Sequence, residues 1–274
     1  MPTITASAVQ ELRTKTGVGM MACKKALIEV NGEIKEAIKY LREKGLSNAA
    51  KKAERATKEG SVFIQISDDH KTGVILEINC ETDFVAKNDD FLETGNYLAQ
   101  TILAQNNVDH KDDLANLKLE NFNNFQEYLS EKILKTGENL VVKNLQKIKT
   151  SGFLSQYIHL NGKIGVLVEF SADVDSTLGK DISMQIAASN PLYVAPSDMP
   201  AADVEKEKEI IKKQVLNEGK PANIVDKIVL GKLSKYYKEV CLLEQAFVKN
   251  PDKAVKQILP AGIKINTFVR LALV

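Results

Sequence analysis

The sequence predicts an α+β fold, and three observations lead to that class. The first 46 residues carry apolar side chains at helical spacing between glycine breaks. A layout of strand, polar turn, strand and helix then occurs twice, in 61–139 and in 140–274. Within the second copy, about 202–240 contains two charged helices with narrow apolar stripes. We therefore expect a three-helix N-terminal module, a duplicated α+β core of small antiparallel sheets covered by helices, and a protruding antiparallel coiled-coil hairpin.

The N-terminal module, 1–46, is predicted from capping residues and glycines. Ser7 or Thr5 can cap a first helix, and Gly17 and Gly19 break the chain before a second helix at 20–30. Apolar residues at positions i, i+3, i+4 and i+7 predict a third helix, which we expect to end at Gly45. A Lys- and Ala-rich linker, 47–60, is expected to follow it.

The two copies of the core are predicted from paired apolar strands. The strands lie at 63–66 and 73–78 in the first copy, and at 155–158 and 165–170 in the second. The helices that follow them include 98–106 and 182–190, and a connecting helix is expected at 123–136. We expect 140–149 to add a strand to the second copy, and 263–274 to close its sheet. The expected domains are therefore 1–46, the linker, 61–139, and 140–274 with the hairpin.

The hairpin is predicted from two helices joined by a tight turn. The first is highly charged over 203–213, and the second begins near Ala222. The segment Gly219-Lys220-Pro221 supplies the turn between them. The same pattern also fits a surface helix pair packed on the body of the protein.

Composition and length restrict the function classes. The chain has 274 residues, of which 44% are hydrophobic and 27% charged, as in globular proteins of two or three units. No apolar run approaches the roughly 18 residues of a membrane span, so we expect no membrane partner. No secretory leader is visible, and the cysteines Cys23, Cys80 and Cys241 are odd in number and far apart. These features favour a reducing, cytoplasmic location.

Charge is unevenly distributed along the chain although the net charge is only +1. Residues 1–58 hold 12 basic and 6 acidic side chains, 61–131 hold 4 and 14, and 132–274 hold 21 and 15. An acidic middle between basic ends is not typical of a protein that binds a phosphate backbone, so no direct nucleic-acid partner is expected. It is typical of a protein that docks on another protein.

The segment Cys80–Asn88 is the main candidate for a functional site. The apolar run 73–79 before it predicts a buried strand, and Asn88 with the two aspartates after it predicts a turn and a helix cap. The candidate site residues Thr82, Asp83, Phe84 and Val85 therefore lie on a strand-to-helix loop, where contact residues are common. Considered by itself, Phe84 is more simply expected to fold back into the core, because most phenylalanines are buried.

Five motifs in register resemble the bacterial elongation factor Ts family. They are Asn79–Asn88 (NCETDFVAKN), Leu12-Arg13 with Thr16–Leu27 (TGVGMMACKKAL), Lys135–Asn139 (KTGEN), Tyr157–His159 with Gly162–Leu167, and Asn217–Pro221 (NEGKP). The motifs follow one another over nearly the whole chain. Two positions differ from the usual family pattern: Ala22 stands where Asp is usual, and Lys143-Asn144 where Arg-rich pairs are common.

The resemblance implies a guanine-nucleotide exchange factor that binds elongation factor Tu, either GDP-bound or nucleotide-free. It implies that Phe84 enters the partner near its Mg²⁺ and phosphate site, with Asp83 holding the loop in place. It also implies a ubiquitin-associated-like fold for the N-terminal module. An assembly as a homodimer, or as a heterotetramer with the partner, stays open.

Seven further residues are expected to belong to the same or an adjacent contact surface. They are Val18, Met20, Met21, Gly137, Glu138, Asn139 and His159. Two simpler interpretations compete with this one. Met20 or Met21 is expected to be core, and His159 can equally be a hydrogen-bonded residue at a strand end.

No motif for covalent chemistry, a cofactor or a metal is present. Residues 17–22 fit the pattern Gly-x-Gly-x-x-Ala, but a helix precedes them instead of the strand that a dinucleotide loop requires. The chain has no P-loop, and its three histidines are not spaced for zinc. We expect no enzyme activity and no cofactor. Two alternatives remain: an RNA-associated protein that uses the basic residues 1–58, and a thiol enzyme that uses Cys23 or Cys80.

Overall fold

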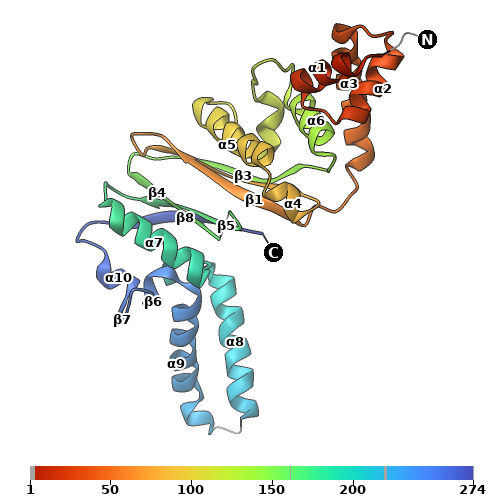
Figure 1. Cartoon of the computed structure of the whole chain (residues 1–274). Coiled ribbons are helices and arrows are strands. Elements are labelled where there is room, and N and C mark those ends of the chain that lie inside the picture. The colour runs from red at the N-terminus through yellow and green to blue at the C-terminus, as the bar shows by residue number, and fades with distance from the viewer. Residues whose placement is uncertain (1–3, 161, 219–220, 274) are drawn as a thin grey trace.

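The computed structural model describes residues 4–160, 162–218 and 221–273, and it has the α+β architecture that the sequence predicts (Figure 1). Two three-stranded antiparallel sheets form the centre. The first contains β1 (Glu59–Ile66), β2 (Thr72–Cys80) and β3 (Val141–Lys149), in that order. The second contains β4 (Phe153–His159), β5 (Ile164–Phe170) and β8 (Ile265–Ala272).

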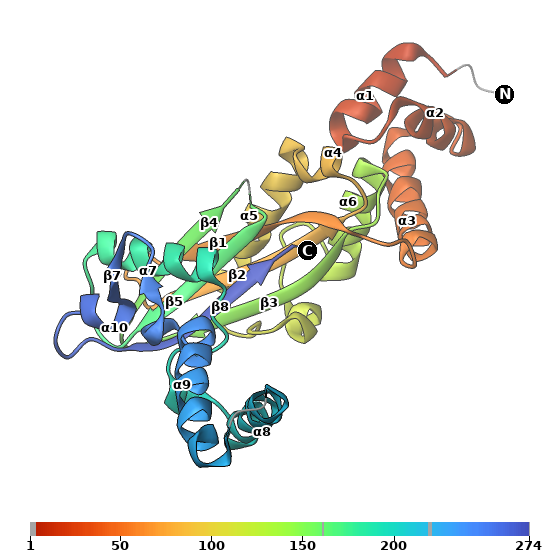
Figure 2. The same cartoon turned by 90° about the horizontal axis from the view of Figure 1, so that it is seen from below.

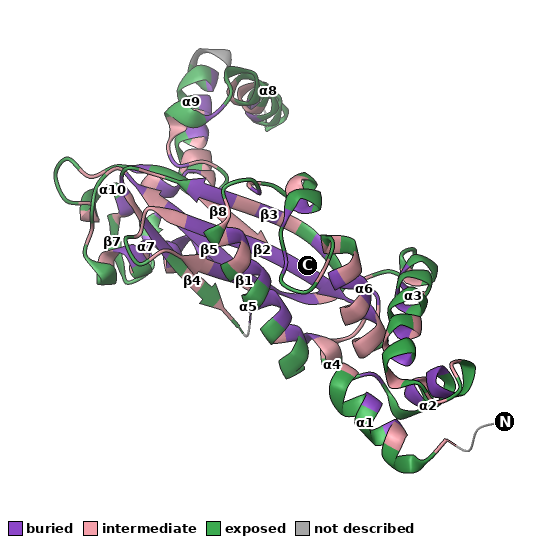
Figure 3. Cartoon of the chain, turned by 90° about the horizontal axis from the view of Figure 1, so that it is seen from above, coloured by how far each residue is buried: buried purple, intermediate pink, exposed green. Residues whose placement is uncertain are grey.

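The sheets pack face to face and are covered by helices on their outer sides. Six buried side chains fill the space between them: Val62, Ile64, Ile75, Ile148, Leu154 and Leu167. Helices α5 (Asp89–Ala104) and α6 (Phe125–Thr136) cover the first sheet, and α7 (Ser176–Ser189) covers the second (Figure 1). The buried residues follow the strands through the middle of the molecule (Figure 3). This arrangement is the expected pair of α+β units, each helix shielding one apolar sheet face.

The expected strand at 140–149 exists, but its assignment to the second sheet is wrong. β3 pairs with β2 in the first sheet, with Leu76 opposite Leu145. The reason is that Val142 and Leu145 belong to the apolar core beneath α5. The expected closing strand is confirmed, because β8 pairs with β5 over nearly the whole predicted range; Val274 lies outside the described residues.

The N-terminal module consists of α1 (Ala6–Thr16), α2 (Met20–Glu29) and α3 (Ile34–Lys52). Thr5 caps α1 through its side-chain oxygen, which accepts a hydrogen bond from the Ala8 amide. The prediction that the third helix ends at Gly45 is wrong, because α3 continues to Lys52. Gly45 permits a close approach instead: a Cβ there would lie 3.4 Å from the Ser130 carbonyl oxygen and 3.6 Å from Leu134 Cδ2, both on α6.

Two antiparallel helices, α8 (Ala201–Asn217) and α9 (Ala222–Val240), project from the second unit. Their contact consists of five buried side chains: Ile211, Val215, Val225, Val229 and Leu233. The N-terminal module and this helix pair lie at opposite ends of the molecule (Figure 2). The predicted turn between the helices falls partly outside the described residues. Coiled-coil packing and the domain limits stay predictions.

Short elements complete the described chain. They are the helical turns α4 (Asp83–Ala86) and α10 (Val255–Ile258), the 3-10 turns at Lys111–Asn116, Pro196–Asp198 and Leu242–Glu244, and the strands β6 (Ala246–Phe247) and β7 (Asn250–Ala254). Among the helices that the model describes, none combines the length and the apolar character needed to cross a membrane.

Candidate functional site

The predicted contact loop is a single helical turn between β2 and α5. Thr82 begins α4 as its N-cap, since its side-chain oxygen accepts a hydrogen bond from the Val85 amide at 3.4 Å. Asn88 caps α5 in the same way, accepting from the Asp90 amide at 2.8 Å. The turn therefore has fixed ends, and the predicted strand-to-helix connection contains one capped turn of helix.

Phe84 points away from the core. Its side chain is 83% exposed, while Val85 packs against the core of the first unit and Ala86 is buried in it. The expectation that Phe84 folds back into the core is therefore wrong. The reason is that Val85 and Ala86 occupy the inner side of this short turn, and Phe63 and Phe91 already fill the adjacent core with ring centroids 5.9 Å apart. A large exposed aromatic side chain on a fixed turn is an available anchor for a partner.

Asp83 stands beside Phe84 and forms an ion pair within the same turn. Its carboxylate lies 2.8 Å from the Lys87 Nζ atom, one helical turn later. The hydrogen bond from Lys87 holds the pKa of the Asp83 carboxyl below its ordinary value. Asp83 is therefore an ionised, accessible acceptor on the surface that presents Phe84.

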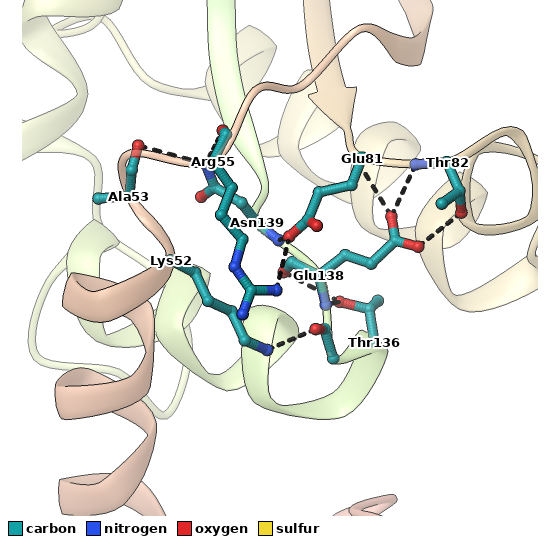
Figure 4. Close-up of polar contacts among 9 residues, drawn as sticks. Lys52, Ala53, Arg55, Glu81, Thr82, Thr136, Glu138 and Asn139 are labelled. Carbon is teal, nitrogen blue, oxygen red and sulfur yellow. Dashed lines mark hydrogen bonds and ion pairs between the residues drawn. The ribbon is translucent and has the colours of Figure 1, made fainter.

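Glu138 connects the start of this turn to the end of α6 (Figure 4). Its Oε2 atom accepts hydrogen bonds from the amides of Glu81 and Thr82, both at 3.0 Å. Its Oε1 atom accepts a hydrogen bond from the Thr82 hydroxyl at 2.5 Å. The carboxylate thus holds two backbone donors and the capping side chain of α4.

The Glu81 carboxylate in turn accepts a hydrogen bond from the segment that contains Glu138. Its Oε1 atom accepts a hydrogen bond from the Asn139 amide at 2.7 Å and lies 3.4 Å from Arg55 Nη1. The Asn139 side chain donates to the carbonyl oxygens of Arg55 and Ala53, at 3.1 and 3.4 Å. We call Glu81, Thr82, Glu138 and Asn139 the brace of the Phe84 turn. The brace also contacts the chain after α3, where the N-terminal module ends (Figure 4).

Gly137 and Asn139, the predicted residues on either side of Glu138, differ in their exposure to solvent. Gly137 is exposed and ends α6 in the left-handed conformation, with φ of 79°. Asn139 is only 3% exposed, and its backbone amide and side chain are engaged in the hydrogen bonds of the brace. Sequence reasoning missed Glu81, Arg55 and Lys52, which donates to the Gly137 carbonyl oxygen. The available signal for Glu81 was its place directly before the predicted contact residue Thr82.

The two methionines of α2 are exposed, whereas Val18 is not. Met20 is 49% and Met21 78% exposed, so the expectation that one of them is core is wrong. Val18 is only 2% exposed and packs in the N-terminal core, so it does not share the exposed surface of Met20 and Met21. The Gly17 loop packs on Lys135, whose Nζ atom lies 3.1 Å from Asp90 Oδ1 on α5. Through Lys135 of α6, these contacts connect the turn between α1 and α2 to α5, the helix that follows the Phe84 turn.

His159 lies on the second sheet at the end of β4. It is partly exposed, and its Nδ1 atom forms a hydrogen bond of 2.9 Å with the Tyr157 hydroxyl. The following turn packs on the first sheet, because Gly162 accepts from the Val62 amide at 2.7 Å and Lys163 pairs with Glu59 at 2.5 Å. The structure thus places His159 on the side of the molecule where β1 begins and β2 ends, and gives it the hydrogen bond expected of a strand-end residue.

The interpretation as a thiol enzyme loses support at Cys80. All three cysteines are buried, and burial raises the pKa of the Cys80 thiol to about 12. Its Sγ atom donates to the Thr82 carbonyl oxygen at 3.1 Å, so Cys80 is a protonated structural residue and not a nucleophile. Within the described ranges, no group of three His, Cys, Asp or Glu side chains is arranged to hold a metal ion.

Comparison with known proteins gives one consistent family. A family model described as elongation factor TS matches residues 81–274, a range that begins at the brace. The chain is 47% identical over 279 residues to the elongation factor Ts of Clostridium perfringens (strain SM101 / Type A), covering 97% of this chain and 92% of that protein. It is 48% identical over 273 residues to the elongation factor Ts of Halothermothrix orenii, covering 97% and 90%.

Proposed function

Because the chain belongs to the elongation factor Ts family of translation elongation factors, we propose that it is a guanine-nucleotide exchange factor for elongation factor Tu. In this proposal it binds the GDP-bound or nucleotide-free partner and promotes GDP release and GTP loading. The observation that carries the proposal is Phe84, a fully presented aromatic side chain on a capped and braced turn.

The proposed mechanism uses Phe84 as a wedge. Burying an exposed Phe side chain in a partner contributes about 1.5–3 kcal/mol, which can offset a local distortion of that partner. Mg²⁺ requires near-ideal octahedral geometry, so a small displacement of its ligands weakens the contacts to both the ion and the phosphates. Asp83 and Val85 would flank the wedge, with Asp83 accepting from backbone or polar groups of the partner.

The proposed activity is a coupling of two binding equilibria. If this chain lowers the affinity of the partner for GDP by some factor, GDP lowers the affinity of the partner for this chain by the same factor. The chain opens a path through a ternary complex and leaves the overall nucleotide equilibrium unchanged. No covalent bond is made or broken, and none of the proposed steps uses a cofactor.

We propose that the secondary contacts are Met20, Met21, Gly137 and His159. The α8–α9 pair would reach a different part of the partner as an antiparallel coiled coil, and the N-terminal helices would act as a ubiquitin-associated-like module in a cytoplasmic protein. The exposed methionines support this assignment, because Met adapts to a foreign surface. Assembly as a homodimer, or as a heterotetramer with the partner, remains part of the proposal.

Stopped-flow release of a fluorescent GDP analogue from elongation factor Tu tests the proposal. We expect strong acceleration by the wild-type chain and loss of roughly tenfold to a hundredfold of it in Phe84→Ala, since about 1.5–3 kcal/mol of wedge burial is removed. Leu192→Ala, which truncates an exposed apolar side chain of the second unit, is the matched control and should retain acceleration.

Three outcomes separate the alternatives. Loss of acceleration in Phe84→Ala with binding retained supports the wedge. Acceleration that survives the mutation keeps the exchange function and moves its origin to Met20, Met21, His159 or the helix pair. If the wild-type chain causes no acceleration with a matched partner, the proposal fails, and salt-dependent RNA binding by residues 1–58 becomes the next function to measure.

A further inference from the structure

We propose that Glu138 is a positioning residue that sets the orientation of the Phe84 turn, and not a residue that contacts the partner. This inference rests on the proposed function of Phe84 and names a second residue on which that function depends. It assigns Glu138 a role different from the one that sequence reasoning gave it.

The first argument is that the Glu138 carboxylate is directed inward. Both oxygens are engaged by the chain itself, Oε2 by two amides and Oε1 by the Thr82 hydroxyl. A carboxylate accepts about four hydrogen bonds, and three of these sites are used within the brace. At most one acceptor site is left for a partner, and any closer engagement would displace charge-assisted bonds of the brace, which are the stronger class.

The second argument is that the contact fixes the cap of α4. The Thr82 hydroxyl has one proton, and donating it to Glu138 turns the lone pairs of the oxygen toward the Val85 amide. Glu138 therefore orients the cap, the cap orients the turn, and the turn carries Phe84 at its second position. Glu138 itself need not touch Phe84.

The third argument is that the brace joins distant segments while keeping two acids close together. Glu81 and Glu138 are 57 positions apart in the sequence. The Glu138 carboxylate accepts from the Glu81 amide, and the Glu81 carboxylate accepts from the amide of Asn139, the residue after Glu138. Two carboxylates beside the same turn repel each other, and the Arg55 guanidinium offsets that repulsion through its contact with Glu81. Keeping both acids beside one turn is consistent with a requirement for rigidity at this point.

The test compares two substitutions of Glu138, one that changes the charge of the side chain and one that changes its length. Glu138→Gln keeps the length and one acceptor oxygen but loses the charge, whereas Glu138→Asp keeps the charge and is one methylene shorter. If Glu138 positions the turn, GDP release should fall roughly tenfold in the Asp variant, because the shorter side chain withdraws both acceptor oxygens from the turn and depletes the competent conformation. It should fall less in the Gln variant, which keeps the reach and an acceptor oxygen for the Glu81 and Thr82 amides. The same substitutions at the exposed Glu120 are the matched controls and should change nothing.

A double mutant supplies a readout that general destabilisation would not give. In a Phe84→Ala background, Glu138→Asp should reduce GDP release by less than about twofold, because the group that it positions is gone. The reverse order of effects, with Asp close to wild type and Gln impaired, would overturn the inference and indicate a charge contact with the partner. Equal, additive losses in both backgrounds would overturn it as well.

Amide hydrogen exchange in the free protein separates this inference from the proposed function. The Glu81 and Thr82 amides should exchange at least about tenfold faster in Glu138→Asp than in wild type, since their acceptor is withdrawn. Unchanged exchange would overturn the positioning role even if GDP release is impaired. Faster exchange, combined with a wild-type chain that fails to release GDP, would retain the brace and refute the exchange function. If Glu138→Asp does not fold, Thr82→Val tests the same contact from its other end.

Discussion

The two halves of the core share one layout but connect strand to helix in different ways. In the first half, β2 leads through α4 into α5, and the aromatic side chain of that connection, Phe84, is almost fully exposed. In the second half, β5 ends at Phe170, which is fully buried, and the chain runs to α7 without an intervening helical turn. The first connection is held by Glu138, whereas the second is held by Lys264, the residue before β8, through bonds in both directions with Ser171. The difference teaches that a duplicated scaffold can keep one connection for packing and use the other for presentation.

The largest test of this comparison concerns the two phenylalanines. Phe170→Ala should lower the free energy of unfolding by about 3–5 kcal/mol, because it leaves a cavity in the second core. Phe84→Ala should change stability by only about 0.5 kcal/mol or less while abolishing most exchange activity. Urea denaturation followed by circular dichroism measures the free energy of unfolding of both variants. Similar losses of stability in the two variants would contradict the division of roles.

A second test compares the glycines at which each helix meets its sheet. A Cβ at Gly95 on α5 would lie 2.2 Å from the buried Phe63 ring, and one at Gly179 on α7 would lie 2.7 Å from Ser155 Oγ. Gly95→Ala should therefore destabilise the protein by about 1–3 kcal/mol, since the ring has no free space. Gly179→Ala should cost less, because its clash is milder, whereas the gain in helix propensity of about 1 kcal/mol is common to both helical sites. Thermal unfolding of the two variants side by side would show whether this order is reversed.

The smallest test uses the caps of the same helices. Asn88 caps α5 with an amide, whereas Asp175 caps α7 with a carboxylate that accepts from the Thr177 amide at 2.9 Å. Hydrogen bonding to Thr177 holds the pKa of Asp175 below its ordinary value, so its stabilising effect is complete above about pH 4 and is lost as the pH falls through the lowered pKa. Asp175→Asn should remove this dependence at α7, whereas Asn88→Ala should cost the same at all pH values. Stability measured between pH 7 and pH 3 distinguishes the two caps, and parallel curves for wild type and Asp175→Asn would refute the assignment.

Much of the fold follows from local patterns, and the failures all involve contacts between distant residues. The helix caps Thr5 and Asn88 were predictable because each bonds to an amide two or three residues further along the chain. The apolar stripes of α8 and α9 were predictable because their spacing can be read within each helix. The sheet assignment of β3 was wrong, since strand pairing with β2 depends on a partner more than 60 positions away. Gly45 was taken as a helix end, but its contact with α6 explains its presence inside α3.

The candidate site divides in the same way. The motif located Phe84 and Asp83, and the structure shows both at the surface. The hydrogen bonds of Glu138 and Asn139 within the chain were not predictable, because they reach segments that no local pattern connects to these two residues. The burial of Val18 was not predictable, because a short Gly-rich segment gives no period from which its buried face could be read.

The sequence separation inside the brace also has a consequence during synthesis. The amide of Glu81 leaves the ribosome 57 residues before its acceptor, Glu138. At about 5–20 residues per second, the Phe84 turn waits roughly 3–11 seconds for the carboxylate that fixes it. Its final shape is therefore a late event in folding, completed only after α6 has been made and docked. A nascent chain that stops before this point would contain the whole recognition motif without the means to hold it in position.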